Sequence, residues 1–155
     1  MTDYDGGNTM DARRSKILIA DDDEDILELV RLRLSRAGHE IVLARNGAEA
    51  LELARSSRPD LALLDVTMPM MDGYQVTREL RADPATSHLP IVLLTARAQT
   101  AEVARGFEAG ADDYVTKPFS PGELQRRVEE ILAGSGRSDQ PLDLLGTFAG
   151  FSGAA

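Results

Sequence analysis

Short apolar runs alternate with longer stretches of mixed character along this chain. The runs fall at residues 16–20, 39–44, 61–65, 91–95 and 113–116, and leucine or β-branched residues are frequent in them. Their length and composition predict short strands, most of them buried on both faces. The stretches between them repeat apolar residues every three or four positions, which predicts helices with one buried face.

Local signals mark where the expected helices begin and end. Asp23 and Asp72 are expected at helix entries, because a short acidic side chain accepts hydrogen bonds from the first free N–H groups. The pair Asn46 and Gly47 is typical of a turn that starts a helix. His39 follows a glycine that ends a helix, and it is expected to be a turn residue rather than a ligand.

Strands that alternate with helices predict an α/β domain in three layers, with helices on both faces of a parallel sheet and right-handed crossovers. The carboxyl ends of such strands share one edge, where open α/β sheets bind their ligands. Asp65 ends one strand at that edge. It is a candidate functional residue, although a turn before Pro69 would also favour an aspartate here. Asp112 and Asp113 are expected only as turn residues.

Polar side chains also follow three of the other expected strands. Strand 16–20 leads into three consecutive carboxylates, strand 91–95 ends in Thr-Ala, and strand 113–116 leads into Lys-Pro-Phe. With the Asp65 stretch, these motifs in this order closely resemble the receiver domain of bacterial two-component response regulators, over about residues 16–133. The resemblance is carried by Asp21, Asp22, Asp65, Thr95, Ala96, Lys117, Pro118 and Phe119.

The resemblance implies a doubly wound, flavodoxin-like (βα)5 fold with five parallel strands in the order 2-1-3-4-5. That order brings Asp21, Asp22 and Asp65 together. Neighbouring carboxylates repel one another and stay ionised only beside cations, and oxygen ligands of this kind suit Mg²⁺. The resemblance assigns metal contacts to Asp22, Asp65 and the backbone carbonyl of Thr67, with Asp21 acting largely through water.

The resemblance makes Asp65 the acceptor of a phosphoryl group from a sensor histidine kinase or a histidine phosphotransfer protein. Phosphoryl transfer depends mainly on positioning and charge neutralisation, and an ionised carboxylate needs no general base. Lys117 supplies a positive charge, while Thr95 and the backbone N–H of Ala96 are expected at the phosphoryl oxygens. The Lys117–Pro118 peptide is expected in cis. No enzymatic activity beyond self-phosphorylation and self-dephosphorylation is expected.

Three further residues are expected to govern the lifetime and the output of the signal. Thr67 and Arg97 lie two residues beyond Asp65 and Thr95, and by the resemblance they flank the route of attacking water and tune the rate of hydrolysis. Tyr114 corresponds to a mobile aromatic residue of the family, but simple packing in its strand explains it equally well. If it moves, the face formed by helix 98–109, strand 113–116 and the last helix is the expected surface for a downstream protein or a homodimer.

Composition narrows the function classes. The 155 residues carry a net charge of −9, which argues against direct contact with nucleic acid. The chain has no cysteine, no apolar run of membrane-spanning length and no signal-peptide pattern at its start. Together these features predict a cytoplasmic protein that makes no membrane contact.

Three alternatives remain open. A phosphorelay intermediate or phosphate sink would accept phosphate without a conformational output. A phosphatase of the haloacid-dehalogenase type also uses an aspartate, Mg²⁺ and a lysine, but its second aspartate is missing from the sequence Asp65-Val66-Thr67. A phosphorylation-independent interaction module would be expected to have lost an acidic residue or the lysine.

The expected organisation is a disordered N-terminal arm at 1–14, a receiver domain at 15–133, and a flexible linker with a short apolar tail at 134–155. The tail is either a docking segment or an unstructured end. Its large apolar residues are Leu142, Leu144, Leu145, Phe148 and Phe151.

Overall fold

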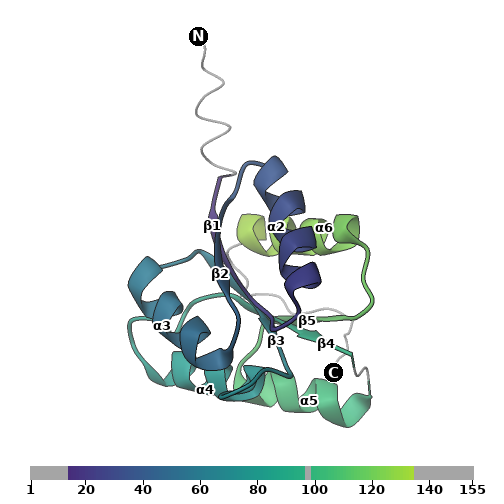
Figure 1. Cartoon of the computed structure of the whole chain (residues 1–155). Coiled ribbons are helices and arrows are strands. Elements are labelled where there is room, and N and C mark those ends of the chain that lie inside the picture. Colours follow the sequence, from purple (N-terminus) through teal and green to yellow (C-terminus); the bar gives the residue numbers. More distant parts are fainter. Residues whose placement is uncertain (1–13, 97–98, 135–155) are drawn as a thin grey trace.

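The computed structural model describes residues 14–96 and 99–134. Strands and helices alternate along them, as the apolar pattern predicts (Figure 1). The strands form one parallel sheet in the order β2-β1-β3-β4-β5, which confirms the order implied by the resemblance. The elements are β1 (Lys16–Ala20), α2 (Glu24–Arg36), β2 (Glu40–Ala44), α3 (Gly47–Ser57), β3 (Leu61–Asp65), α4 (Gly73–Ala82), β4 (Ile91–Thr95), α5 (Thr100–Ala109), β5 (Asp113–Thr116) and α6 (Pro121–Gly134).

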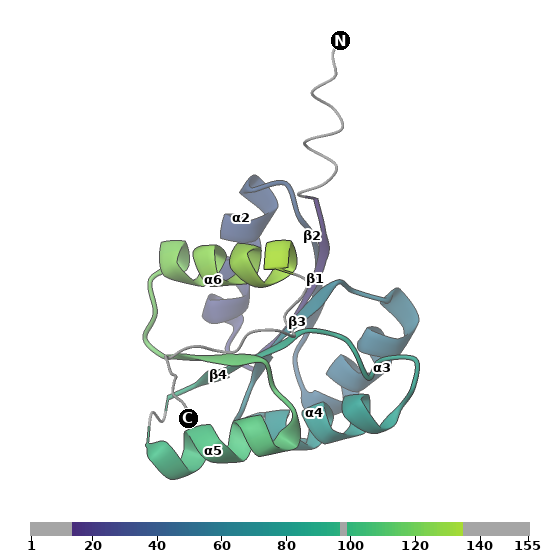
Figure 2. The same ribbon diagram turned by 180° about the vertical axis from the view of Figure 1, so that it is seen from behind.

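Helices cover both faces of the sheet. α2 and α6 lie on one face, and α3, α4 and α5 lie on the other (Figures 1 and 2). Successive side chains of a strand point to opposite faces. Ile17 and Ile19 of β1 therefore pack with α2 and α6, whereas Leu18 and Ala20 pack with the helices opposite. This is the predicted three-layer architecture, and it explains why the central strands are apolar throughout.

The expected helix-entry residues cap their helices. The Asp23 side chain accepts hydrogen bonds from two backbone N–H groups in the first turn of α2, and Asn46 accepts one in α3. Asp72 forms a reciprocal capping box with Gln75 at the start of α4. These caps confirm the predicted helix starts and hold three helix N-termini at the edge of the sheet where the strands end.

Two details differ from the predicted layout. The second strand begins at Glu40 rather than at His39, because its pairing with β1 begins with Glu40 opposite Lys16, the first residue of β1. His39 itself is buried. Its Nδ1 accepts a hydrogen bond from the Ser15 N–H at 3.2 Å, and its Nε2 lies 3.2 Å from Glu129 Oε2. His39 therefore links two layers, where only a turn residue was expected. α6 extends to Gly134, one residue past the expected end of the domain.

Some predictions fall on residues that the structure does not describe. The expected N-terminal arm, except for its last residue, and the expected apolar tail lie outside the described residues. The helix expected from about residue 98 is described from Thr100 onward. Within the described part of the chain, no helix has the length and apolar character needed to cross a membrane.

Candidate functional site

β3 delivers Asp65 to the edge of the sheet where the strands end. All of β3 is buried, and Asp65, its last residue, has only 5% of its surface exposed. The parallel register pairs Leu64 with Ala20 of β1, and it pairs Asp65 with Leu94 of β4. The residues that directly follow β1 and end β4 therefore flank Asp65.

Two carboxylates from the β1–α2 connection join Asp65. One oxygen from each of Asp21, Asp22 and Asp65 lies within 4.8 Å of the others. Asp21 is fully buried, and its Oδ1 accepts a hydrogen bond from the Asp23 N–H at 3.0 Å, whereas Asp22 is exposed. The structure thus brings together the three carboxylates that the predicted strand order places side by side.

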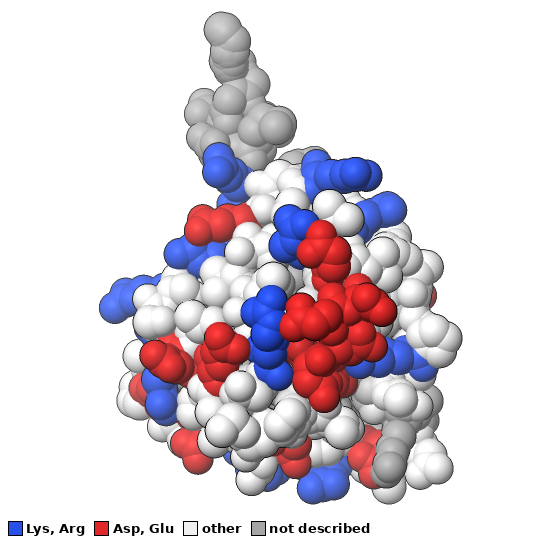
Figure 3. Space-filling view, in the orientation of Figure 1, with Lys and Arg blue, Asp and Glu red and all other residues white. Residues whose placement is uncertain are grey.

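The acidic cluster reaches the molecular surface. In Figure 3 carboxylates gather in one patch over the first turn of α2, with basic side chains at its border. The exposed acidic residues of this connection and of the first turn of α2 are Asp22, Asp23, Glu24 and Asp25. Such a patch attracts cations toward Asp65.

Lys117 faces these carboxylates from the β5–α6 connection. Its Nζ lies 2.9 Å from Asp21 Oδ2 and 3.2 Å from Asp65 Oδ1. The Lys117 N–H donates a hydrogen bond to the Thr95 carbonyl at 2.7 Å, which holds the backbone beside the end of β4. The Lys117–Pro118 peptide is cis, as predicted.

Burial and the neighbouring charges shift the pKa values of Asp65 and Lys117. Burial, and after it the negative charge of Asp21, raises the pKa of Asp65 to about 6, although Lys117 partly offsets both. Burial by itself lowers the pKa of Lys117, but the contacts with Asp21 and Asp65 outweigh burial and raise that pKa above its usual value. Lys117 is therefore a cation at neutral pH, whereas ionised Asp65 is held at a free-energy cost.

The donor set of this cluster fits a divalent cation. Three carboxylates face one ammonium group, which leaves two more negative than positive charges when all three are ionised. Mg²⁺ prefers oxygen ligands in octahedral geometry and keeps several waters. Because Asp22 is exposed, water has access to this side of the cluster. Asp21, Asp22 and Asp65 are therefore candidate metal-binding residues.

The other predicted site residues lie just beyond β3 and at the end of β4. Thr95 is buried at the end of β4, and Ala96 follows it in an exposed position. Thr67 is exposed in the loop after Asp65. Arg97 lies outside the described residues, so its expected influence on phosphoryl lifetime stays a prediction.

Tyr114 lines a pocket between α5 and the sheet. Its ring meets the Phe107 ring edge to face, with centroids 5.9 Å apart and planes at 83°. Val66, Tyr74 and Thr95 line the same pocket, which therefore extends to the ends of β3 and β4. Tyr114 packs against its neighbours in this structure and also adjoins the space next to Thr95.

Comparison with known proteins decides the family. The family model for the response regulator receiver domain matches residues 17–129. The chain belongs to the response regulator receiver family. This receiver is 44% identical over 136 residues to the DNA-binding response regulator MtrA of Mycolicibacterium smegmatis, a match that covers 88% of this chain and 58% of that protein. The chain spans about half of the length of the curated relatives it matches.

Solved receiver structures share the fold. A putative response regulator from Chloroflexus aurantiacus is 43% identical, with a TM-score of 0.74, and the match covers 77% of this chain and 98% of that one. The receiver domain of the sensor histidine kinase PA1611 from Pseudomonas aeruginosa is 33% identical, with a TM-score of 0.72, over 77% of this chain and 98% of that one. The PA1611 receiver holds a magnesium ion coordinated in its active-site cleft.

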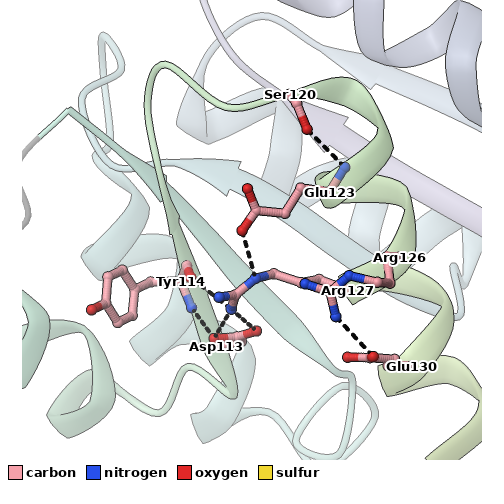
Figure 4. A network of polar contacts seen from close by, with 7 residues as sticks. All are labelled: Asp113, Tyr114, Ser120, Glu123, Arg126, Arg127 and Glu130. Atoms are coloured by element: carbon pink, nitrogen blue, oxygen red, sulfur yellow. Dashed lines mark hydrogen bonds and ion pairs between the residues drawn. The ribbon is translucent and has the colours of Figure 1, made fainter.

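Sequence reasoning missed the partners of two aspartates near β5. Arg127 of α6 donates to both carboxylate oxygens of Asp113, at 3.0 and 2.8 Å, and its Nε lies 3.6 Å from Glu123 (Figure 4). Arg81 of α4 lies 2.9 Å from Asp112. The charges were visible in the sequence, but the partners stand 14 and 31 positions apart, so no local spacing rule connects them.

Proposed function

We propose that this receiver takes a phosphoryl group onto Asp65 from a phosphohistidine of a sensor histidine kinase or a histidine phosphotransfer protein. The position of Asp65 carries the proposal: the residue ends a buried strand, 3.2 Å from Lys117 and within the carboxylate cluster formed with Asp21 and Asp22. The magnesium ion in the active-site cleft of the PA1611 receiver supports a metal-dependent reaction.

In the proposed transfer, an Asp65 carboxylate oxygen attacks the phosphorus atom. The new P–O bond forms while the P–N bond breaks, and its electron pair leaves with the imidazole nitrogen of the donor. Asp65 needs no general base, because it is ionised above its pKa of about 6. Lys117 holds its positive charge beside the Asp65 oxygen and is placed to neutralise a phosphoryl oxygen.

Mg²⁺ in this site would neutralise the phosphoryl oxygens and the carboxylates during transfer. Asp22, Asp65 and the Thr67 carbonyl would hold it directly, with Asp21 acting through water. The Thr95 hydroxyl and the Ala96 N–H would bind phosphoryl oxygens of the product. That product is a mixed anhydride, which water hydrolyses, so the signal is temporary and the receiver is no enzyme in the sense of turning over a separate substrate.

A conformational output is the second part of the proposal. Thr95 moves toward a phosphoryl group on Asp65, and Tyr114 then takes up space in the pocket that both residues line. α5 is suited to move with them, because its buried residues are only Gly106 and Ala109 and its N-terminus has no side-chain cap. The face formed by α5, β5 and α6 is therefore the proposed surface for a downstream protein or a homodimer.

The other partner predictions remain proposals. The MtrA relative is described as DNA-binding, but this chain spans 58% of that protein. Because this chain has a net charge of −9, we expect it to make no direct contact with nucleic acid. The cytoplasmic location also stays a prediction.

Intact-protein mass spectrometry tests the acceptor residue. With Mg²⁺ and acetyl phosphate, the wild-type chain should gain the mass of one phosphoryl group. Asp65→Asn should gain none, because the amide is nearly isosteric but does not accept a phosphoryl group. Asp23→Asn is the matched control: Asp23 is an exposed helix cap, and asparagine caps equally well, so this variant should behave as wild type.

Two outcomes would contradict the proposal. An equal mass gain in Asp65→Asn would show that another residue accepts the phosphoryl group. Continuous turnover of a free phosphomonoester by the wild-type chain would favour the phosphatase alternative over a stoichiometric acceptor.

A further inference from the structure

The loop between β3 and α4, residues 66–72, contains a backbone conformation that side chains rarely adopt. Met70 has a φ of 73°, in the left-handed region that favours glycine. The residue is 80% exposed, so burial of the methionine does not account for the conformation. A residue stays in such a conformation only when its surroundings hold it there, and such residues cluster at functional sites.

The Met70 turn is held from within the loop and from outside it. The Met71 N–H donates to the Pro69 carbonyl at 2.8 Å, which closes a three-residue turn around Met70. The Gly47 N–H donates to the same carbonyl at 3.3 Å. Gly47 is the first residue of α3 and stands more than 20 positions earlier in the chain. The N-terminus of α3 therefore also holds the tip of this loop.

Gly47 also packs against the turn more closely than any other residue type could. A Cβ built on Gly47 would lie 1.8 Å from the Met71 carbonyl oxygen and 2.6 Å from its carbonyl carbon. Real Cβ atoms essentially never approach other atoms within 3.0 Å. The obstructing atoms belong to backbone, so no side-chain rotation relieves the clash, and the loop or α3 would have to move.

The other end of the loop is fixed at the site itself. The Gly73 N–H donates to the Val66 carbonyl at 2.9 Å, and a Cβ on Gly73 would lie 2.6 Å from the Asp65 carbonyl oxygen. Thr67 stands between these two anchors, one at Asp65 and one at the tip under Gly47. The backbone at Thr67 is thus held from both ends of the loop.

We propose that Gly47 is a positioning residue for the metal site, because the N-terminus of α3 clamps the Met70 turn and thereby fixes the backbone at Thr67, whose carbonyl is among the metal contacts of the proposed function. The inference rests on the proposed metal-dependent function for its effect on Mg²⁺, but the clamp itself is a property of the loop. Groups that orient metal ligands typically change metal affinity or activity by about 10- to 100-fold when they are altered.

The test compares Gly47→Ala with Gly122→Ala in the full chain. Gly122 is the matched control, because it also lies in the first turn of a helix and a Cβ there would meet only the end of the flexible Arg33 side chain, at 3.2 Å. Alanine favours helix over glycine, so neither variant should lose stability through helix propensity. In Gly47→Ala the dissociation constant for Mg²⁺ should rise about 10- to 100-fold by calorimetry, and backbone amide shifts should change at residues 66–72. Gly122→Ala should show neither effect.

Gly47→Ala with wild-type Mg²⁺ affinity and unchanged amides at residues 66–72 would overturn the inference. If Gly47→Ala does not fold, Asn46→Ala replaces it: the variant removes the hydrogen bond that Asn46 Oδ1 accepts from the Glu49 N–H at 2.8 Å and so loosens the start of α3. Weakened Mg²⁺ binding and shifted loop amides would then support the clamp, and their absence would overturn it. If the wild-type chain binds no Mg²⁺, the proposed function fails, while the loop amides still decide whether Gly47 positions the loop.

Discussion

At the scale of single residues, the protein alone stabilises the ionised form of Asp65 poorly. Burial and the neighbouring Asp21 raise its pKa from 3.8 to about 6, and Lys117 recovers only part of that cost. The folded chain therefore binds a proton at Asp65 more tightly than the unfolded chain does. Proton binding at Asp65 therefore stabilises the folded chain. This stabilisation is fully present below pH 3.8 and is lost as the pH rises through about 6.

Removing the Asp65 charge should stabilise the metal-free protein. Asp65→Asn should raise the free energy of unfolding at pH 7 by on the order of 1–3 kcal/mol. The gain should shrink as the pH falls from about 6 toward 3.8, because wild-type Asp65 then becomes neutral as well. Urea unfolding in EDTA at several pH values measures it, with Asp23→Asn as the control. A destabilised or unchanged Asp65→Asn at pH 7 would show that Asp65 is not electrostatically strained.

At the scale of elements, the ion pair of Arg127 with Asp113 links α6 to β5. Burial raises the pKa of Asp113, while Arg127 opposes that rise. Both side chains are less than half exposed, and Arg127 reaches both oxygens of the carboxylate (Figure 4). A charge-assisted contact at a partly buried carboxylate contributes more than a solvent-exposed pair does.

Arg127→Ala should therefore destabilise the chain by about 1.5–3 kcal/mol at pH 7, since it leaves a half-buried carboxylate without its cationic partner. Without Arg127 the pKa of Asp113 rises further, so the loss should diminish as the pH falls and Asp113 takes up a proton. Urea unfolding of wild type and Arg127→Ala near pH 7 and pH 4.5 measures the loss of unfolding free energy at each pH.

Arg126→Ala is the matched control on the same helix. Its partner Glu130 is more than half exposed, as Arg126 is, and such pairs contribute about 0–1 kcal/mol. Equal losses in the two variants would show that the Arg127 contact has no special role in holding α6.

Local features explain why the sequence predicted the helix starts and the strands so closely. Asp23 and Asn46 bond to groups within three residues of themselves, so their roles follow from short-range rules. The contacts of Arg127 with Asp113, and of Gly47 with Met71, depend instead on how separate elements pack. The turn signal at Asn46 and Gly47 predicted a helix start but contained no information about the loop that packs against it.

At the scale of the whole molecule, strand order decides which residues meet. The periodicity of the strands predicts a parallel sheet, but it does not determine the order of the strands. That order came from the family resemblance, and with it the convergence of Asp21, Asp22 and Asp65, which the structure confirms. The positions of the proposed acceptor and its neighbours were therefore predictable, whereas the contact of Gly47 with the Met70 turn was not.

In the proposed function, phosphoryl chemistry at Asp65 is transmitted to the face formed by α5, β5 and α6. Amide NMR of the full chain with Mg²⁺ and beryllium fluoride, a phosphate mimic, tests it most directly, with Asp65→Asn as the second sample. In the wild-type chain, shifts should begin at Asp65 and extend through Thr95 to residues 99–119, while Asp65→Asn should show none of them. Wild-type shifts that stay within the Asp65 pocket, or equal shifts in both samples, would contradict this transmission.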